Sequence, residues 1–329
     1  MTTYLIRRSF FGVITLLVIT MLVYGLIRSM PGDPSKVEAA ESDPSRRMSQ
    51  EDYELIRKAY ELDKPWYEAY FLWLGHLFQG DLGRSIRYRT SVSVLIGRNL
   101  GPTLLLSVTS LVITYVASVP MGLYVSRHSG QWNERLLSIF LYALYSLPTY
   151  VAALWLLYVF YLRLQGTPFQ LQPGMTSDEY ASYSAMGKLL DIGKHLILPL
   201  VCYSYGALAF DTRFIKANME EALRQDYIRT ARAKGLDDRT IIWRHAFRNT
   251  LIPFVTLLGL TLPGLIGGAI ILEQIFSWPG IGLLYYDALN YRDYPVIMGL
   301  TFIFAVATLL GQLLADFLYA MVDPRVTYQ

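Results

Sequence analysis

Runs without charged side chains alternate along this chain with segments in which charged residues gather. Five of the uncharged runs are long enough for an α-helix to cross the hydrocarbon of a bilayer, which takes about 20 apolar residues. They lie at residues 9–27, 99–126, 136–162, 249–272 and 294–315. A sixth run, residues 195–210, is shorter, and we extend it past Asp211 because long basic side chains at a helix end reach the interface. The pattern predicts an all-α integral membrane protein with six transmembrane helices.

The same pattern divides the chain into three parts. Residues 1–29 are predicted to form the first transmembrane helix, and residues 30–98 a helical loop outside the cytoplasm. The first run is longer than the roughly 7 to 15 apolar residues of a cleaved signal peptide, which favours a retained helix. Residues 99–329 form the core, with helices at about 99–126, 136–162, 195–215, 249–272 and 294–318 and a cytoplasmic loop at 216–248.

The basic residues set the orientation, because short cytoplasmic loops of membrane proteins carry more Lys and Arg than outer loops do. With the N-terminus in the cytoplasm, the inner side holds nine Lys and Arg residues from Arg213 to Arg248, together with Arg7, Arg8, Arg127, Arg135 and Arg325. The two shorter outer loops then hold only Arg163, Lys188, Lys194 and Arg292. Six spans return the C-terminus to the cytoplasm.

The composition agrees with a membrane protein and argues against an intrachain disulfide and a histidine metal site. Of the 329 residues, 53% are hydrophobic and 17% are charged, against roughly a quarter charged in soluble domains. The one cysteine, Cys202, excludes an intrachain disulfide. The four histidines are too scattered for the ligand spacing of a metal site.

Residues 216–248 carry the strongest local signals in the chain. We expect a helix over residues 220–234, which Gly235 ends in a left-handed conformation, and a second helix from Asp238 with Asp237 as its cap. Seven Lys and Arg residues between Glu220 and Arg248 are opposed by five Asp and Glu residues, so no basic stripe for nucleic acid is present.

The outer loop shows one further helix signal. Pro65 is suited to start a helix, and the residues after it are rich in aromatic side chains: Trp66, Tyr70, Phe71, Trp73 and Phe78. Two interpretations stay open. These rings either lie at the headgroup level or pack on the membrane core, as interfacial aromatic residues do, or they form a ligand-stacking site.

Residues 226–236 and 244–253 resemble the cytoplasmic coupling loop of ATP-binding cassette importer permeases. More narrowly, they are similar to the first, B-type, membrane subunit of dipeptide and oligopeptide uptake systems, although Arg229-Thr230-Ala231 stands where the wider family often has Glu-Ala-Ala. Further motifs of that family follow the same order along the chain, at residues 31–34, 80–85, 273–282, 292–295 and 323–325.

The resemblance implies the fold of a type I importer permease in the bacterial cytoplasmic (inner) membrane. It implies as partners a second homologous permease subunit, two cytoplasmic ATP-binding subunits and an extracytoplasmic substrate-binding protein, besides the lipid bilayer and without nucleic acid. It assigns ATPase coupling to Asp226, Tyr227, Arg229, Thr230, Ala231, Arg232, Lys234, Gly235 and Leu236. The importer would carry dipeptides or oligopeptides, or alternatively a metal chelate or a sugar.

The chain itself has no phosphate-binding loop, because neither Gly-Lys pair has a following Ser or Thr or a glycine placed to complete the cradle. We therefore expect a transport subunit that is no enzyme and holds no cofactor, with ATP and Mg on the partner subunits. A membrane-embedded enzyme is disfavoured because His-Glu-x-x-His and Gly-x-Ser-x-Gly are both missing from the sequence. A stand-alone secondary transporter is disfavoured because we find no internal repeat.

Four carboxylates inside or near the predicted spans are the remaining candidates for function: Asp211, Glu273, Asp287 and Asp316. For Glu273 and Asp316, at the ends of their spans, we expect a partly solvated or Arg-paired side chain. Gly264 and Gly268 have the spacing that lets two helix backbones approach closely, and we interpret them as helix-packing residues. The sequence does not identify the residues of the translocation pathway.

Overall fold

The computed structural model describes residues 2–30, 54, 57–58, 61–261 and 264–322. Within these residues every regular element is a helix. The helices at least eight residues long are α1 (Thr2–Ser29), α4 (Trp66–Phe78), α5 (Val92–Arg127), α6 (Trp132–Ser146), α7 (Thr149–Leu157), α8 (Ala185–Leu223), α9 (Asp226–Ala233), α11 (Arg248–Thr261), α14 (Ile281–Tyr291) and α15 (Tyr294–Val322). The shorter ones are η1 (Tyr158–Arg163), η2 (Asp178–Ser182), α10 (Asp238–Thr240), η3 (Ile241–Phe247), α12 (Gly264–Gly267) and α13 (Ile270–Ile275).

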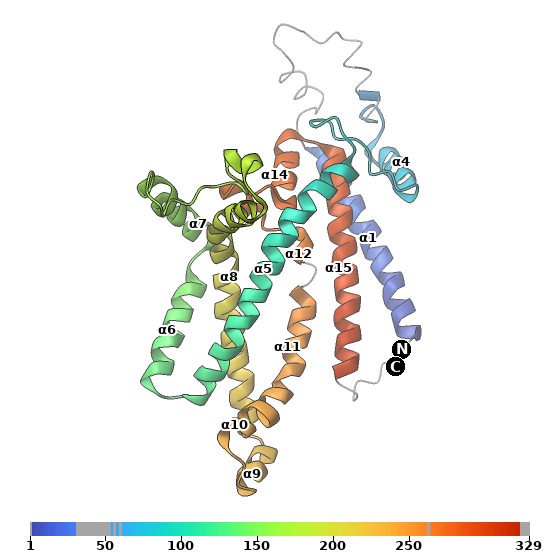
Figure 1. Ribbon diagram of the computed structural model, residues 1–329. Helices are drawn as coiled ribbons and strands as arrows, with labels where there is room; N and C mark the ends of the chain where they lie inside the picture. Colours follow the sequence, from blue (N-terminus) through green and yellow to red (C-terminus); the bar gives the residue numbers. More distant parts are fainter. Residues whose placement is uncertain (1, 31–53, 55–56, 59–60, 262–263, 323–329) are drawn as a thin grey trace.

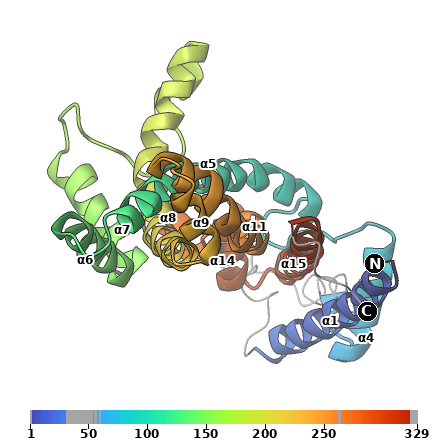
Figure 2. The same ribbon diagram turned by 90° about the horizontal axis from the view of Figure 1, so that it is seen from below.

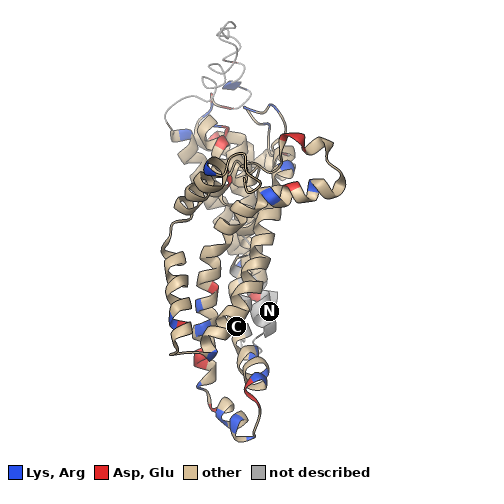
Figure 3. Ribbon diagram, turned by 60° about the vertical axis from the view of Figure 1, so that its left-hand side comes forward, with Lys and Arg blue, Asp and Glu red and all other residues tan. Residues whose placement is uncertain are grey.

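The long helices form an elongated bundle whose two ends differ. The start of α1 and the end of α15 lie toward the same end as α9 and α10, whereas α4 lies toward the other end (Figure 1). Charged residues gather near the two ends and are sparse between them (Figure 3). This arrangement is the one that the charge pattern predicts for a protein that crosses a membrane.

Among the described residues, four helices are long and apolar enough to span a membrane, α1, α5, α8 and α15, and a bent pair, α6 with α7–η1, would make a fifth span. Two of them extend well beyond the predicted bounds, since α5 begins at Val92 and α8 at Ala185. The added turns of α8 hold Lys188, Asp191 and Lys194, so a search for uncharged runs could not detect them. Ser184 caps that end, because its hydroxyl accepts the Gly187 N–H at 3.2 Å.

The prediction of one continuous span over residues 136–162 is wrong. Helix α6 and the pair α7–η1 meet at an angle of 89°. The bend lies at Leu147 and Pro148, because proline has no N–H for the helix ladder and forces the residue before it out of the helical region. Leu147 accordingly has an extended backbone, with ψ at 117°.

The predicted span over residues 249–272 is also broken. Helix α11 ends at Thr261, and α12 and α13 follow as short segments with a break at residues 268–269. Gly268 has a φ of +66°, a left-handed conformation that glycine adopts without a steric penalty. The backbone therefore turns at this point instead of continuing as a helix.

Helices α5 and α8 pack side by side along the centre of the bundle. Gly122 permits this approach, because a Cβ atom there would lie 2.7 Å from the side chain of Ile215. Helix α1 packs on α15 at one side of the bundle, with α4 beside it (Figure 2). An ion pair between Arg8 and Asp316 joins α1 to α15.

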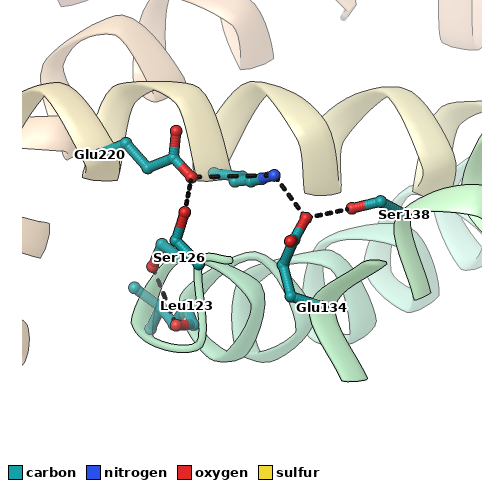
Figure 4. A network of polar contacts seen from close by, with 7 residues as sticks. Leu123, Ser126, Glu134, Ser138 and Glu220 are labelled. Atoms are coloured by element: carbon teal, nitrogen blue, oxygen red, sulfur yellow. Dashed lines mark hydrogen bonds and ion pairs between the residues drawn. The ribbon is translucent and has the colours of Figure 1, made fainter. Parts of the chain in front are cut away.

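A polar network fixes α6 to α8 near the end that carries α9. Lys216 of α8 donates to Glu134 of α6 at 2.7 Å and lies 3.7 Å from Glu220. The Ser138 hydroxyl donates to the same Glu134 oxygen at 2.8 Å (Figure 4). The network holds three charged side chains at an end of the bundle that also carries the predicted cytoplasmic loop.

Candidate functional site

The turn after α9 has the geometry that its sequence predicts. Gly235 follows the last helical turn with a φ of +74°. Its N–H donates to the Arg232 carbonyl at 2.9 Å, and the Leu236 N–H reaches back to the Ala231 carbonyl at 3.3 Å. These two bonds form a Schellman motif, which satisfies the last carbonyls of a helix. The predicted left-handed glycine is confirmed.

Asp237 then caps the next helix, also as predicted. Its side chain accepts the Thr240 N–H at 3.2 Å. This hydrogen bond lowers the pKa of the Asp237 carboxyl below its ordinary value, because the bond favours the charged form. Helices α10, η3 and α11 follow without a gap, so the turn leads directly into the membrane bundle.

The prediction of one helix over residues 220–234 is wrong at its start. Helix α8 ends at Leu223, where the Arg224 and Gln225 N–H groups close a final turn on Glu221 and Ala222 at 3.2 Å. Gln225 is extended, with ψ at 154°, and α9 begins at Asp226. The long helix and the short one are therefore separate elements that meet at a corner.

One face of α9 is buried against the rest of the chain. Ile228 and Ala231 are 0% and 4% exposed and belong to a cluster with residues of α8, η3 and α11: Ile215, Met219, Ala222, Ile241, Ala246 and Phe254. Burial of such side chains contributes about 1.5–3 kcal/mol for each large residue. The cluster attaches α9 firmly to the ends of two bundle helices.

Ala231 differs from the other residues assigned to coupling, because its side chain faces the interior of this chain. Its part in coupling stays a prediction. The other residues assigned to coupling are exposed: Asp226, Tyr227, Arg229, Thr230, Arg232, Lys234, Gly235 and Leu236. Asp226 and Arg229 form a surface ion pair at 3.4 Å. The exposed set forms the outer face of α9 and of the glycine turn, which we call the coupling face.

An exposed aromatic residue extends this surface beyond the predicted residues. Trp243 is 51% exposed and lines a hollow of about 510 Å³ together with Arg239, Thr240 and Arg244. A large apolar side chain beside two guanidinium groups is typical of protein interfaces. The prediction did not include Trp243, because the motif used for it begins at Arg244, although an indole in a predicted cytoplasmic loop was a usable signal.

Glu273 anchors a second site, at the other end of the broken span. It is 1% exposed, and its carboxyl accepts the Thr103 hydroxyl at 3.1 Å and the Leu283 N–H at 3.0 Å. The Thr103 oxygen in turn accepts the Ile281 N–H at 2.7 Å. Trp278 donates its indole N–H to the Pro102 carbonyl at 3.0 Å. These bonds tie the segment around α13 to α5 and α14.

Three glycines make room for this carboxyl. A Cβ atom at Gly280 would lie 2.4 Å from a Glu273 oxygen, and one at Gly268 would lie 2.6 Å from the other. At Gly282 the corresponding distance is 2.9 Å. Within the described chain a Cβ atom at Gly264 would meet nothing within 4 Å, so the assignment of Gly264 and Gly268 as helix-packing residues stays a prediction.

Asp293 forms a similar anchor between the outer loop and the start of α15. Its carboxyl accepts the Ser85 hydroxyl and, at 3.2 Å each, the N–H groups of Ile86 and Arg87. Burial raises the pKa of Asp293 although these donors oppose the rise. The motifs at residues 80–85 and 292–295 thus meet in space.

A cavity of about 380 Å³ opens between the helices of the bundle, away from both ends. It is lined by residues of α5, α6, α8, α11 and α12, among them Ser107, Ser110, Thr114, Tyr115, Tyr145, Tyr203, Phe210 and Asp211. The α5 residues belong to a buried polar stripe at helical spacing: Thr103, Ser107, Ser110, Thr114 and Ser118. That spacing was visible in the sequence, and the prediction did not use it.

Two family models together cover most of the chain. Residues 118–328 match the binding-protein-dependent transport system inner membrane component, and residues 1–92 match the N-terminal part of the membrane components of such systems. The chain belongs to this family. It is accordingly a permease of the inner membrane and a transport component rather than an enzyme.

Relatives and one solved structure agree with that assignment. The permease is 37% identical to the oligopeptide transport system permease protein AppB of Bacillus subtilis, over 100% of both chains. It is 31% identical to the glutathione transport system permease protein GsiC of Escherichia coli, again over 100% of both chains. The fold resembles an inward-facing structure of the MetNI methionine ABC transporter, with a TM-score of 0.52 at 18% identity, over 70% of this chain and 97% of that one.

The structure gives the four candidate carboxylates of this permease four different surroundings. Asp316 is Arg-paired, as predicted. Glu273 is buried and bonded to neutral donors, so the prediction of a solvated or Arg-paired side chain is wrong. Asp287 accepts a long hydrogen bond from Tyr88 at 3.4 Å near the outer end. Asp211 faces the bundle cavity.

The outer aromatic helix begins next to Pro65, as its sequence predicts. Ala69 and Tyr70 are buried, and Tyr70 packs on Tyr24 of α1 with ring centroids 5.8 Å apart. The Tyr70 hydroxyl donates to the Leu17 carbonyl at 3.1 Å. Part of α4 therefore packs on the membrane helices.

The predicted motifs at residues 31–34 and 323–325 lie outside the described residues.

Proposed function

We propose that this permease is one membrane half of an ATP-driven importer for dipeptides or oligopeptides. Support for the substrate class comes from the full-length similarity to a relative named as an oligopeptide permease. Two cytoplasmic ATP-binding subunits bind ATP and Mg. A second homologous permease completes the translocation pathway, and an extracytoplasmic protein delivers the ligand.

The observation that carries the mechanism is the two-sided character of α9. Its inner face is buried with residues of α8 and α11, whereas the coupling face exposes Tyr227 of α9, Leu236 of the glycine turn and several basic side chains. A force applied to the outer face is transmitted to two bundle helices, because close-packed interiors deform little. Closure of the ATPase dimer moves these helices and turns the pathway outward, and hydrolysis reverses the movement.

A pair of substitutions at one position tests this coupling. A Cβ atom added at Gly235 would meet nothing within 4 Å, and the residue has a positive φ. Asparagine tolerates that backbone conformation and adds little volume, whereas tryptophan adds a large side chain to the coupling face. We expect Gly235→Trp to reduce peptide uptake at least tenfold and to reduce co-purification of the ATPase, while Gly235→Asn retains both.

The amount of each variant in the membrane is measured in parallel, because loss of the protein would imitate loss of coupling. Arg135→Ala, an exposed basic residue of α6 outside the coupling face, serves as a further control. Normal uptake and normal ATPase co-purification in Gly235→Trp would overturn the assignment of this turn.

A further inference from the structure

Asp211 is a buried carboxylate for which the fold provides no partner. It is 6% exposed, and no described residue forms a hydrogen bond or an ion pair with its side chain. It lies twelve residues before Leu223, the end of α8, which is about 18 Å along the helix axis. Its side chain lines the cavity between the helices, where an unpaired charge is costly and a residue of this kind usually serves function.

The basic residues that follow Asp211 on α8 already have other partners. The Arg213 guanidinium lies over the Tyr142 ring, 4.1 Å from its centroid. Lys216 is held by Glu134 and Glu220. Neither of these cations pairs with Asp211, so a cation that enters the cavity would meet a carboxyl that no described basic residue occupies.

The remaining lining of the cavity suits a small cation. Tyr203 contributes an aromatic ring, and the faces of such rings attract ammonium groups. The Tyr145 ring is already stacked on Phe210 and lies 5.5 Å from the Arg213 guanidinium. The hydroxyls of Ser107 and Ser110 are engaged in bonds at 2.9 and 2.8 Å. The Thr114 hydroxyl is buried with no partner among the described residues. The described residues that line the cavity thus include one acidic side chain, the Tyr203 ring and an available hydroxyl, and no Lys or Arg is among them.

We propose that this cavity binds the primary ammonium group of the transported ligand, with Asp211 as its counter-ion. The inference rests on the proposed function, because a peptide with a free amino end carries such a group. An ammonium donates up to three hydrogen bonds, and a charge-assisted bond to a carboxylate is stronger than a neutral one. The same chemistry could come from a basic side chain of the second permease, and the experiment distinguishes the two sources.

Chemical protection in the purified, complete transporter tests the proposal. Dicyclohexylcarbodiimide attaches to carboxyl groups in apolar surroundings, and mass spectrometry of the digested chain measures its attachment at Asp211. The two probes are dialanine amide and its N-acetylated form, which differ in the ammonium group. We expect the free amine at millimolar concentration to reduce labelling at Asp211 at least threefold and the acetylated probe to leave it unchanged.

Equal protection by both probes, or protection by neither, would overturn the proposal. If Asp211 is unlabelled in the complete transporter but labelled in the isolated permease, its counter-ion belongs to the second permease and the proposal is also wrong. Co-purification of the ATPase in the same sample shows that the proposed function holds independently of these outcomes.

Uptake measurements give a second readout. We expect Asp211→Asn to reduce uptake of a labelled dipeptide at least tenfold with normal ATPase co-purification, and Asp211→Glu to restore part of it because the charge is retained. Asp287→Asn is the matched control, since Asp287 lies outside the cavity. Equal uptake by Asp211→Asn and wild type would contradict the binding role.

Discussion

Glu273 and Asp211 are two buried carboxylates of one membrane bundle, and their surroundings are opposite. Glu273 accepts hydrogen bonds from Thr103 and Leu283 and is enclosed by three glycines. Asp211 faces a cavity of about 380 Å³ and has no bonded partner in the described part of the chain. The first carboxylate holds elements together, and the second is left open for a partner.

The difference shows why a charge inside a membrane protein cannot be interpreted from its presence alone. A buried polar group is structural when the fold supplies its bonds, since removing it then leaves buried donors unsatisfied. It is a candidate for ligand binding when the fold supplies none, because its desolvation is then uncompensated. Substitutions at the buried carboxylates Glu273, Asp293 and Asp211 separate the two cases, and the exposed Asp237 serves as a reference.

The largest expected effect is that of Glu273→Ala. It leaves the Thr103 hydroxyl and the Leu283 N–H without an acceptor in a buried region, and each unsatisfied group costs about 1–3 kcal/mol. We expect a loss of about 4 kcal/mol of stability, measured as a lower midpoint of thermal unfolding in detergent. Gln274→Ala, at the next and less buried position, is the control. An unchanged midpoint in Glu273→Ala would remove the structural half of the comparison.

Asp293→Ala should have the next largest effect. It removes the acceptor for Ser85, Ile86 and Arg87, which join the outer loop to α15. Since this anchor lies at the outer end and not inside the bundle, we expect a loss of about 3 kcal/mol, again measured by thermal unfolding. Asp287→Ala serves as the control, because the 3.4 Å bond from Tyr88 is the one hydrogen bond to Asp287 among the described residues. Equal loss in both variants would show that the bonds to Asp293 contribute little.

Asp211→Asn should scarcely affect folding. It breaks no intramolecular bond and removes a buried charge, so we expect the unfolding midpoint to stay unchanged or to rise, with a change in stability under about 1 kcal/mol. The measurement uses the same thermal assay as for Glu273→Ala. A large drop in the midpoint would mean that Asp211 has a structural partner, and the contrast with Glu273 would fail.

The smallest effect on stability is expected at Asp237, an exposed carboxylate that accepts one hydrogen bond from the Thr240 N–H. The Thr240 N–H lowers its pKa below 3.8. A lowered pKa in the folded state stabilises the cap above the unfolded value, and this contribution is lost as the pH falls through the folded value. The protection factor of the Thr240 amide, which is the hydrogen-exchange rate of an unstructured amide divided by its own rate at the same pH, should therefore fall in wild type on acidification. In Asp237→Ala the protection should be low at every pH, and a protection factor that still changes with pH in that variant would exclude the cap as the cause.

The parts of the permease that the sequence predicts well depend on local interactions. Gly235 and Asp237 act through bonds that reach three to five residues along the chain, so their motifs predict their conformation. The missed features depend on distant segments. The buried side of Ala231 is set by α8 and η3, and the environment of Glu273 is set by α5 and α14.

By itself the sequence determined that this is a membrane protein, that a left-handed turn lies at Gly235, and which family the chain belongs to. Hydrophobic run length and short motifs are properties of neighbouring residues. The tertiary structure alone decided that residues 136–162 bend by 89°, that the 249–272 segment is broken, and that Asp211 and Glu273 have opposite surroundings. The physical reason is that the cost of a buried charge depends on the donors and cations brought near it, and those come from helices far apart in the chain.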